Sequence, residues 1–226
     1  MTNDSMARRG FLGSACGAMG LLAMAGQDAW AAGEGKATEA SAELKAAREK
    51  LLAEMEANRG IGVPRADGEF LNLMAYATDA KKVLEVGTYR GYSGIWIALA
   101  LEQTGGKLTT IEIDPQRVKE SRANFETAKL ADRITNLLGD AHEVAKTVEG
   151  PLDLVFLDAE KGGEVDYFDT IFPKLRPGGF ILLHNAISSA KAMKPYFEML
   201  AKRNDLVSVI LSLSMKDGFS VTLKKK

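Results

Sequence analysis

A short apolar run that begins at position 83 contains an acidic residue and is followed by two spaced glycines. Glu85, Gly87 and Gly91 give the pattern E-x-G-x-x-x-G. Glycine allows the backbone to turn tightly and to approach a ligand closely, and a carboxylate here suits a cationic ligand better than a pyrophosphate. The methionine portion of S-adenosylmethionine, which carries an ammonium and a sulfonium, is such a ligand. Taken alone, the loop also fits a purely structural strand-to-helix turn.

Two further apolar runs end in polar residues that suit the rest of a nucleoside. Glu112 lies 21 residues beyond Gly91, and an acidic residue at the end of a second strand accepts hydrogen bonds from ribose hydroxyls. The third run ends in Gly139-Asp140-Ala141, where a backbone N–H and a carboxylate can face the adenine edge. The G-x-G-x-x-G spacing of dinucleotide-binding loops is absent, which disfavours a nicotinamide oxidoreductase. We therefore predict S-adenosylmethionine as the cofactor.

These strand ends imply a regular alternation of strands and helices. Apolar runs that predict buried strands occupy residues 83–86, 108–113, 134–138, 154–157 and 180–183. Helical spacing of apolar residues marks 38–58, 67–78, 95–103, 116–128, 142–147, 165–175 and 190–203. Residues 207–214 and 219–223 flank a Lys-Asp-Gly turn and predict a closing hairpin. The alternation predicts an α/β fold, namely a Rossmann-like, doubly wound, mostly parallel sheet with a C-terminal antiparallel hairpin and helices on both faces.

Residues 1–31 have the composition of a twin-arginine-type signal peptide. Two arginines at positions 8 and 9 precede an uncharged stretch at 13–26, and an Ala-Trp-Ala cleavage pattern follows. The apolar stretch is too short and too rich in glycine for a good membrane span. The sequence thus predicts export to the periplasm and a single domain at 32–226, or a cytoplasmic location if the signal is not used. The alternative is a floppy extension that carries the arginine pair by chance.

The composition excludes several other classes of protein. A formal net charge of −1 creates no field that would draw the chain to nucleic acid or to an anionic membrane. Cys16 is the only cysteine, which rules out an internal disulfide framework and a zinc site built from several cysteines. The 226 residues, of which 46% are hydrophobic, suffice for one α/β domain with a full core.

Two runs of sequence carry a resemblance to a known family. VLEVGTYRGYS at 83–93 and LDLVFLDAEK at 152–161 resemble the signatures of class I S-adenosylmethionine-dependent O-methyltransferases of the catechol and caffeoyl-CoA type. The resemblance covers about residues 40–226 and implies methyl transfer to a hydroxyl of a small aromatic, catechol- or caffeate-like acceptor. With Glu85 included, the residues expected to contact the cofactor are Val63, Glu85, Gly87, Tyr89, Ser93, Glu112, Asp140, Ala141, His142 and Asp158.

The same resemblance implies a catalytic base and a metal site. Lys161 matches the family's general base, and Asp158 and Asn185 match two of its ligands to a divalent cation, which is Mg²⁺ by resemblance. A hydroxyl must lose its proton before it attacks the sulfonium methyl, and a divalent cation lowers the pKa of that hydroxyl and orients it.

Position 184 departs from the family pattern, because His184 stands where a second carboxylate is expected. An imidazole removes one negative charge and shifts the preference of the site from Mg²⁺ toward Mn²⁺ or another transition metal. Two interpretations remain open. In one, His184 is a ligand in a modified site with Asp158 and Asn185. In the other, the site binds metal weakly or not at all, and His184 serves in acid–base chemistry or in packing.

The acceptor side also departs from the family. Glu160 stands where the animal enzymes carry a bulky aromatic, and residues 211–214 lack the carboxylate that holds the second catechol hydroxyl there. A rival hypothesis is a non-catalytic or metal-independent S-adenosylmethionine-binding protein on the same fold. Export favours this rival, because S-adenosylmethionine is made in the cytoplasm and would not be replenished outside it. The resemblance is also compatible with a homodimer.

Overall fold

The computed structural model describes residues 41–213 and 216–226. Contacts divide the chain into two units, Met1–Ala46 and Ala47–Lys226. Only the helical end of the first unit is described, so the predicted signal peptide at 1–31 lies outside the described residues. The second unit contains the sheet and every residue of the site considered below. Over the part of the chain that is described, no helix is both long and apolar enough to cross a membrane.

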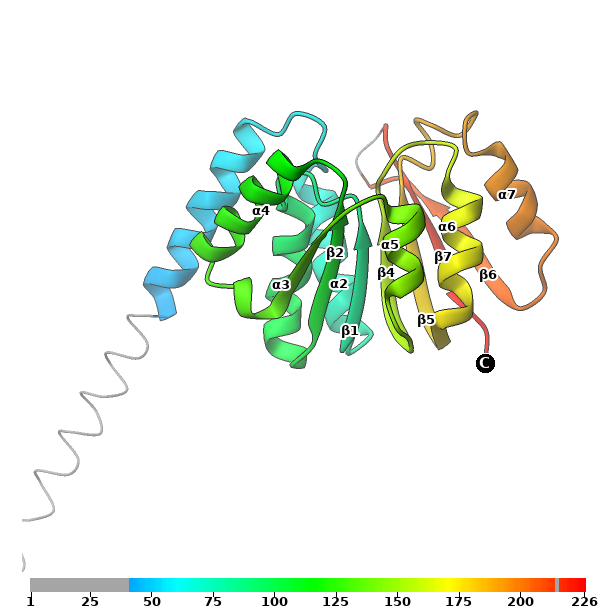
Figure 1. Ribbon diagram of the computed structural model, residues 1–226, viewed down its shortest axis with the longest axis horizontal. Helices are drawn as coiled ribbons and strands as arrows, with labels where there is room; N and C mark the ends of the chain where they lie inside the picture. The colour runs from blue at the N-terminus through cyan, green and yellow to red at the C-terminus, as the bar shows by residue number, and fades with distance from the viewer. Residues whose placement is uncertain (1–40, 214–215) are drawn as a thin grey trace, which may run out of the picture. The chain divides into compact units, whose positions relative to one another are not determined.

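Seven strands form one mixed sheet in the order β3-β2-β1-β4-β5-β7-β6 (Figure 1). The strands are β1 (Lys82–Val86), β2 (Lys107–Glu112), β3 (Ile134–Leu138), β4 (Leu152–Leu157), β5 (Leu175–His184), β6 (Leu206–Leu211) and β7 (Phe219–Lys224). The strands β1 to β5 run parallel, and β7 pairs antiparallel with both β5 and β6. The predicted sheet with its closing hairpin is confirmed. The last strand, β7, lies inside the sheet, and β3 and β6 form its two edges.

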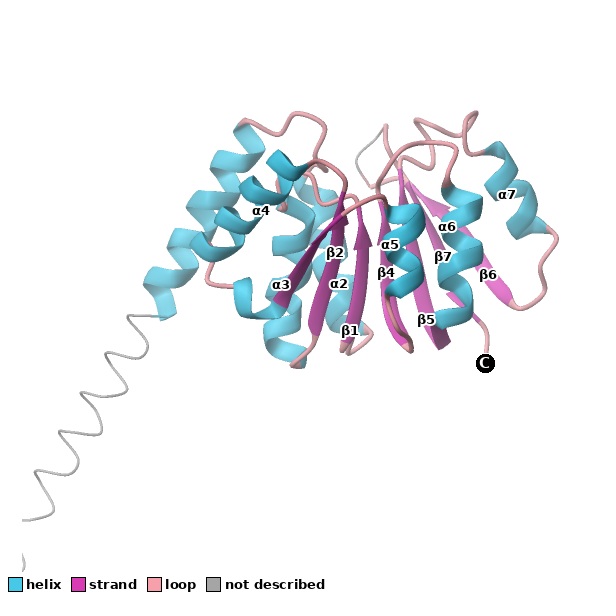
Figure 2. Ribbon diagram, viewed as in Figure 1, coloured by secondary structure: helices cyan, strands magenta, loops and turns pink. Residues whose placement is uncertain are grey.

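Helices cover both faces of this sheet. They are α2 (Arg65–Ala77), α3 (Tyr92–Thr104), α4 (Pro115–Thr127), α5 (Ala141–Thr147), α6 (Glu164–Ile171) and α7 (Lys194–Ala201). Successive strand residues point to opposite faces, so Val83 belongs to one apolar cluster and Leu84 to the other. The first cluster contains side chains of α2, α3 and α4, and the second contains side chains of α5, α6 and α7. In Figure 2, α5, α6 and α7 lie in front of the sheet and α2 lies behind it.

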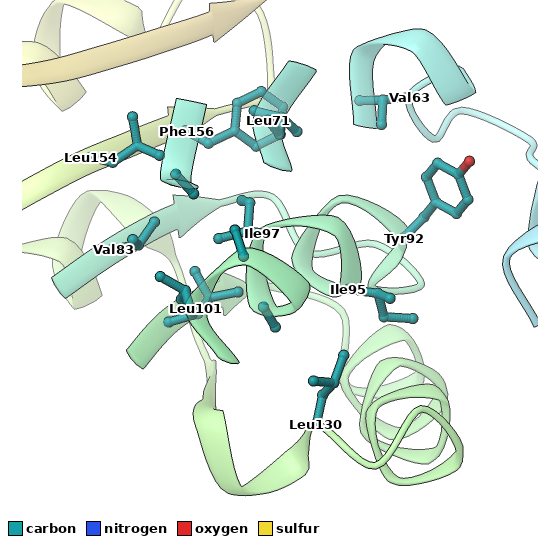
Figure 3. Packing of buried hydrophobic residues seen from close by; sticks show 14 of the residues in the cluster. Val63, Leu71, Val83, Tyr92, Ile95, Ile97, Leu101, Leu130, Leu154 and Phe156 are labelled. Carbon is teal, nitrogen blue, oxygen red and sulfur yellow. The ribbon is translucent and has the colours of Figure 1, made fainter. Parts of the chain in front are cut away.

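The first cluster fixes α3 against the centre of the sheet. Figure 3 shows Val83 of β1 close to Ile97 and Leu101 of α3, and Leu154 on the neighbouring strand β4 belongs to the same cluster. All four side chains are completely buried, and burying a side chain of this size contributes about 1.5–3 kcal/mol. Because α3 is fixed in this way, the loop between β1 and α3 has a defined position at the end of the sheet.

Several predicted elements differ in length from those observed, and two of them, at 180–183 and 190–203, differ most. The strand predicted at 180–183 begins earlier, because β5 continues through the Pro-Gly-Gly segment at 177–179. The pairing with β4 shifts its register between Leu152 and Leu154, which accommodates a proline that lacks a backbone N–H. The helix predicted at 190–203 is shorter in the structure, since its first residues form turns before α7 begins.

Candidate active site

A cavity of about 860 Å³ lies where the parallel strands end. Its wall includes residues that follow β1, β2, β3, β4 and β5 in the chain, and ligands of open α/β sheets bind at this edge. Among the residues predicted to bind or react, the wall contains Val63, Gly87, Tyr89, Ser93, Glu112, Asp140, Ala141, His142, Asp158, Lys161 and Asn185. The other two predicted residues, Glu85 and His184, are buried and do not line the cavity.

The loop after β1 depends on two glycines. Gly87 has a φ of +97°, and a Cβ at this position would lie 2.2 Å from the carbonyl oxygen of Asp158. Gly91 precedes α3 with a φ of +86°, and a Cβ there would lie 2.5 Å from the ring of Phe125. Residues other than glycine rarely adopt these φ values, and neither position has room for a side chain. The E-x-G-x-x-x-G spacing therefore has a steric cause, since Gly87 lies against the end of β4 and Gly91 lies against α4.

Glu85 is completely buried and takes no part in the cavity wall. Its Oε1 accepts a hydrogen bond of 2.5 Å from Ser93 Oγ, and its Oε2 accepts one of 2.6 Å from Thr110 Oγ1. Burial raises the pKa of Glu85 to about 7, although these hydrogen bonds act in the opposite direction. Glu85 therefore does not line the cavity, where the sequence predicted a direct contact with a cationic ligand, but it accepts a hydrogen bond from Ser93, which does line it.

Glu112 is held at the end of β2 by two backbone N–H groups. The N–H of Tyr89 donates to Oε2 over 2.7 Å, and the N–H of Asp114 donates to Oε1 over 3.0 Å. Tyr89 has a φ of +48°, so the first bond stabilises an uncommon loop conformation. Each carboxylate oxygen has a second lone pair, so Glu112 can accept further hydrogen bonds, such as those from ribose hydroxyls. The side chain of Asp114 caps α4 by accepting a hydrogen bond from the N–H of Gln116.

Another part of the cavity wall is built around His142. Asp140 caps α5 by accepting a hydrogen bond from the N–H of His142 over 2.9 Å. The imidazole contacts Asp166 through Nδ1 and Glu160 through Nε2, and it stacks on the ring of Tyr167 with 4.4 Å between ring centroids. The Asp166 contact, supported by Glu160, raises the pKa of His142. Asp166 and Tyr167 were not identified from the sequence, because they reach His142 only through the packing of α6 beside α5.

Asp158, directly after β4, lies between two basic side chains. Lys161 Nζ is 3.1 Å from its Oδ1, and His184 Nδ1 is 3.2 Å from its Oδ2. Burial alone would raise the pKa of Asp158, but His184 and Lys161 together outweigh it and the pKa is lowered. Asp158 is therefore a carboxylate at neutral pH that holds the Lys161 amine at the cavity wall.

His184 has a second partner that sequence reasoning missed. Its Nε2 lies 2.8 Å from Oδ2 of Asp67 in the first turn of α2, and both side chains are buried. Burial would lower the pKa of His184, but the carboxylates of Asp158 and Asp67 raise it to about 9. A signal for Asp67 was present in the sequence: it shares the buried face of α2 with Leu71 and Ala75, at spacings of four residues. An acidic residue on an apolar helix face calls for a buried partner.

The side chains at the end of β4 and β5 fit a divalent cation. Among the described residues, the buried Nδ1 of His184 has no hydrogen-bond partner of acceptable geometry, although the carboxylate of Asp158 is nearby. Asn185 follows with a φ of +61° and lines the cavity. Together these residues offer one nitrogen and several oxygens. A ligating imidazole nitrogen must be free of its proton, so a cation at Nδ1 would replace the proton that His184 otherwise carries.

Comparison with known protein families gives one consistent result. Residues 35–221 match the family model described as O-methyltransferase. A catechol O-methyltransferase from Mycobacterium tuberculosis is 33% identical over 178 residues, which span 72% of this chain and 80% of that protein.

Solved structures show the same likeness. An O-methyltransferase from Bacillus cereus in complex with SAH superimposes with a TM-score of 0.71 at 26% identity, over 80% of this chain and 91% of that one. TomG from Streptomyces achromogenes, an O-methyltransferase involved in tomaymycin synthesis and solved in complex with SAM, gives a TM-score of 0.70 at 27% identity. That match covers 80% of this chain and 90% of the other.

Proposed function

The chain belongs to the family of S-adenosylmethionine-dependent O-methyltransferases, and we propose that its acceptor is a hydroxyl of a small catechol- or caffeate-like aromatic, activated with the help of a divalent cation. One observation carries this proposal. The Lys161 amine and the His184 imidazole lie within 3.2 Å of one carboxylate, that of Asp158. Lys161 and Asp158 line the cavity, and His184 is buried next to them. This is the set of groups that deprotonation of a hydroxyl beside a cation requires.

We assign the two ends of the cavity to the two ends of the cofactor. The loop after β1, with Val63 and Ser93 nearby, would hold the methionine end, and Ser93 would be kept in place by its hydrogen bond to Glu85. Glu112 would accept the ribose hydroxyls. The Asp140 turn and His142 would face the adenine. The supporting observation is that these residues line one continuous cavity in this order of strands.

Lys161 is the proposed general base. In its neutral form its Nζ accepts the proton of the acceptor hydroxyl, while Asp158 holds the amine in position through the 3.1 Å contact. The oxygen then attacks the methyl carbon opposite the sulfur, so that a C–O bond forms, the C–S bond breaks and its electron pair stays on sulfur. When bound, S-adenosylmethionine supplies the electrophilic methyl, and the cation supplies charge that lowers the hydroxyl pKa.

Asp158, His184 and Asn185 are the proposed cation ligands. The imidazole favours Mn²⁺ or another transition metal over Mg²⁺ when compared with a carboxylate at the same position. A metal-independent reaction is the second candidate. It is favoured by one observation: two carboxylates, Asp67 and Asp158, hold the His184 ring and stabilise its protonated form. Export by the signal at 1–31 and homodimer formation remain proposals from the sequence.

A methyl-transfer assay tests the proposed function. The protein is incubated with S-adenosylmethionine and catechol or caffeate, with Mg²⁺, with Mn²⁺ or with a chelator, and product formation is measured. We expect transfer that needs a cation and is faster with Mn²⁺, and we expect His184→Asp to raise the rate with Mg²⁺. Transfer that persists in chelator would favour the metal-independent candidate. Cofactor binding without methyl transfer to any phenol would rule out the proposed acceptor class.

A further inference from the structure

Asp67 and His184 form a buried acid–imidazole pair outside the cavity wall. Asp67 is completely buried and His184 is 3% exposed, and the Oδ2–Nε2 distance is 2.8 Å. A buried carboxylate is costly unless it is paired and hydrogen-bonded. The pair also joins α2 to the end of β5, and its two residues are separated by 117 positions in the chain. The contact therefore forms only when α2 packs against the end of β5 in the folded protein.

The pair fixes which nitrogen of His184 faces the proposed cation site. With Nε2 donating its proton to Asp67, the lone pair of the neutral ring is on Nδ1. This nitrogen is 3.2 Å from Oδ2 of Asp158. Histidines that ligate metals commonly donate their other ring N–H to a carboxylate, which sets the tautomer and raises the basicity of the ligating nitrogen.

We propose that Asp67 is a positioning residue that makes His184 an Nδ1 ligand and restores the charge that the histidine removes from the metal site. Asp158 supplies one negative charge to the ligand set, whereas the neutral imidazole and Asn185 supply none. Asp67 adds a second negative charge one hydrogen bond away from the cation. The site thus has the same negative charge as a site with two carboxylate ligands, but one of its ligand atoms is a nitrogen. A nitrogen ligand suits a first-row transition cation. The inference rests on the cation site of the proposed function.

A competing arrangement involves Asp217, in the turn before β7. One ligand atom each of Asp67, His184 and Asp217 lies within 4.8 Å of the others. A cation held by these three residues would use Nε2 of His184 in place of Nδ1, and Asp67 would then contact the cation directly. The two arrangements differ in the nitrogen that binds, which a spectroscopic measurement can identify.

Calorimetric titration with Mn²⁺ and with Mg²⁺, without acceptor, tests the role of Asp67. We expect Asp67→Asn to weaken Mn²⁺ binding by roughly 10–100-fold, the usual effect of losing such a partner, with a smaller effect on Mg²⁺. In a His184→Asp background the same substitution should cause no loss, because the partner ring is absent. Asp153→Asn, which removes a carboxylate paired with Arg176 away from the cavity, is the matched control and should bind as the wild type does. A folded Asp67→Asn protein with wild-type Mn²⁺ affinity would overturn the inference.

A measurement on the unmodified sequence keeps the inference testable if Asp67→Asn does not fold. The protein is labelled with ¹⁵N-histidine and loaded with ¹¹³Cd²⁺, and nitrogen–cadmium coupling is recorded. We expect coupling to Nδ1 of His184 and none to His142, the only other histidine. Coupling to Nε2, or no coupling at all, would contradict the proposal. If the protein shows Nδ1 coupling but methylates no phenol, the inference about Asp67 still holds. Only the proposed acceptor class is then contradicted.

Discussion

The backbones of Gly87 and Asp158 approach so closely that a Cβ on Gly87 would lie 2.2 Å from the carbonyl oxygen of Asp158. The first residue belongs to the loop predicted to bind the cofactor. The second follows β4 and contacts the proposed base, Lys161. The contact therefore holds the predicted cofactor loop and the proposed base at a fixed separation. Transfer of a methyl group from a cofactor on this loop to an acceptor oxygen beside Lys161 requires such a fixed geometry.

Gly87→Ala should destabilise the protein and abolish S-adenosylmethionine binding. The substitution adds a backbone clash to the cost of a left-handed residue, together about 3 kcal/mol or more. Gly105→Ala is the matched control, because Gly105 has a φ of +78° and a Cβ there would meet nothing within 4 Å. It should cost only about 1 kcal/mol and leave binding intact. Denaturant unfolding and calorimetry measure both quantities, and equal effects of the two substitutions would contradict the steric argument.

Glu85→Gln should remove a pH dependence of stability. Burial raises the pKa of Glu85 from 4.5 to about 7. Between these pH values the folded protein keeps a proton that the unfolded chain has released, so the free energy of unfolding falls as the pH rises through this interval. The loss amounts to about 3 kcal/mol by pH 8. The variant, which cannot titrate, should lack it. If the stability profiles of the two proteins are parallel from pH 5 to pH 8, Glu85 does not titrate within this pH range.

Lys161→Met should reduce the methyl-transfer rate by about 10²–10⁴-fold, the usual effect of removing a general base. Binding of S-adenosylmethionine should change little, because the predicted cofactor contacts lie on other residues. Lys146→Met is the control, since Lys146 is exposed and pairs with Glu143 outside the cavity. Single-turnover kinetics and calorimetry separate the two effects. A Lys161→Met protein that retains the wild-type rate would remove the lysine from the mechanism.

Asp166→Asn should lower the pKa of His142. The contact with Asp166 is the main cause that raises this pKa, and Glu160 contributes less. Glu160→Gln should therefore produce a smaller decrease. NMR titration of the His142 ring protons measures both. If Glu160→Gln has the larger effect, the position of the imidazole between the two carboxylates is different from the one described.

The sequence determined much of this protein by local rules. Strand and helix periodicity, together with turn residues, was enough to predict the parallel sheet and its closing hairpin. The spacing of Gly87 and Gly91 marked the cofactor loop, because a position with a left-handed φ and no room for a Cβ requires glycine. Periodicity and turn residues depend on neighbours within a few positions, so a single chain displays them. The two glycines are visible by residue type and spacing, although the contacts that require them come from the distant residues Asp158 and Phe125.

The tertiary structure decided what depends on contacts between distant segments. It buried Glu85 against Ser93 and Thr110, where the sequence predicted a direct contact with the ligand. It also paired Asp67 with His184 across 117 positions. The physical reason is that the partner of a buried charge is set by how helices pack on the sheet, and sequence spacing alone does not encode that distance.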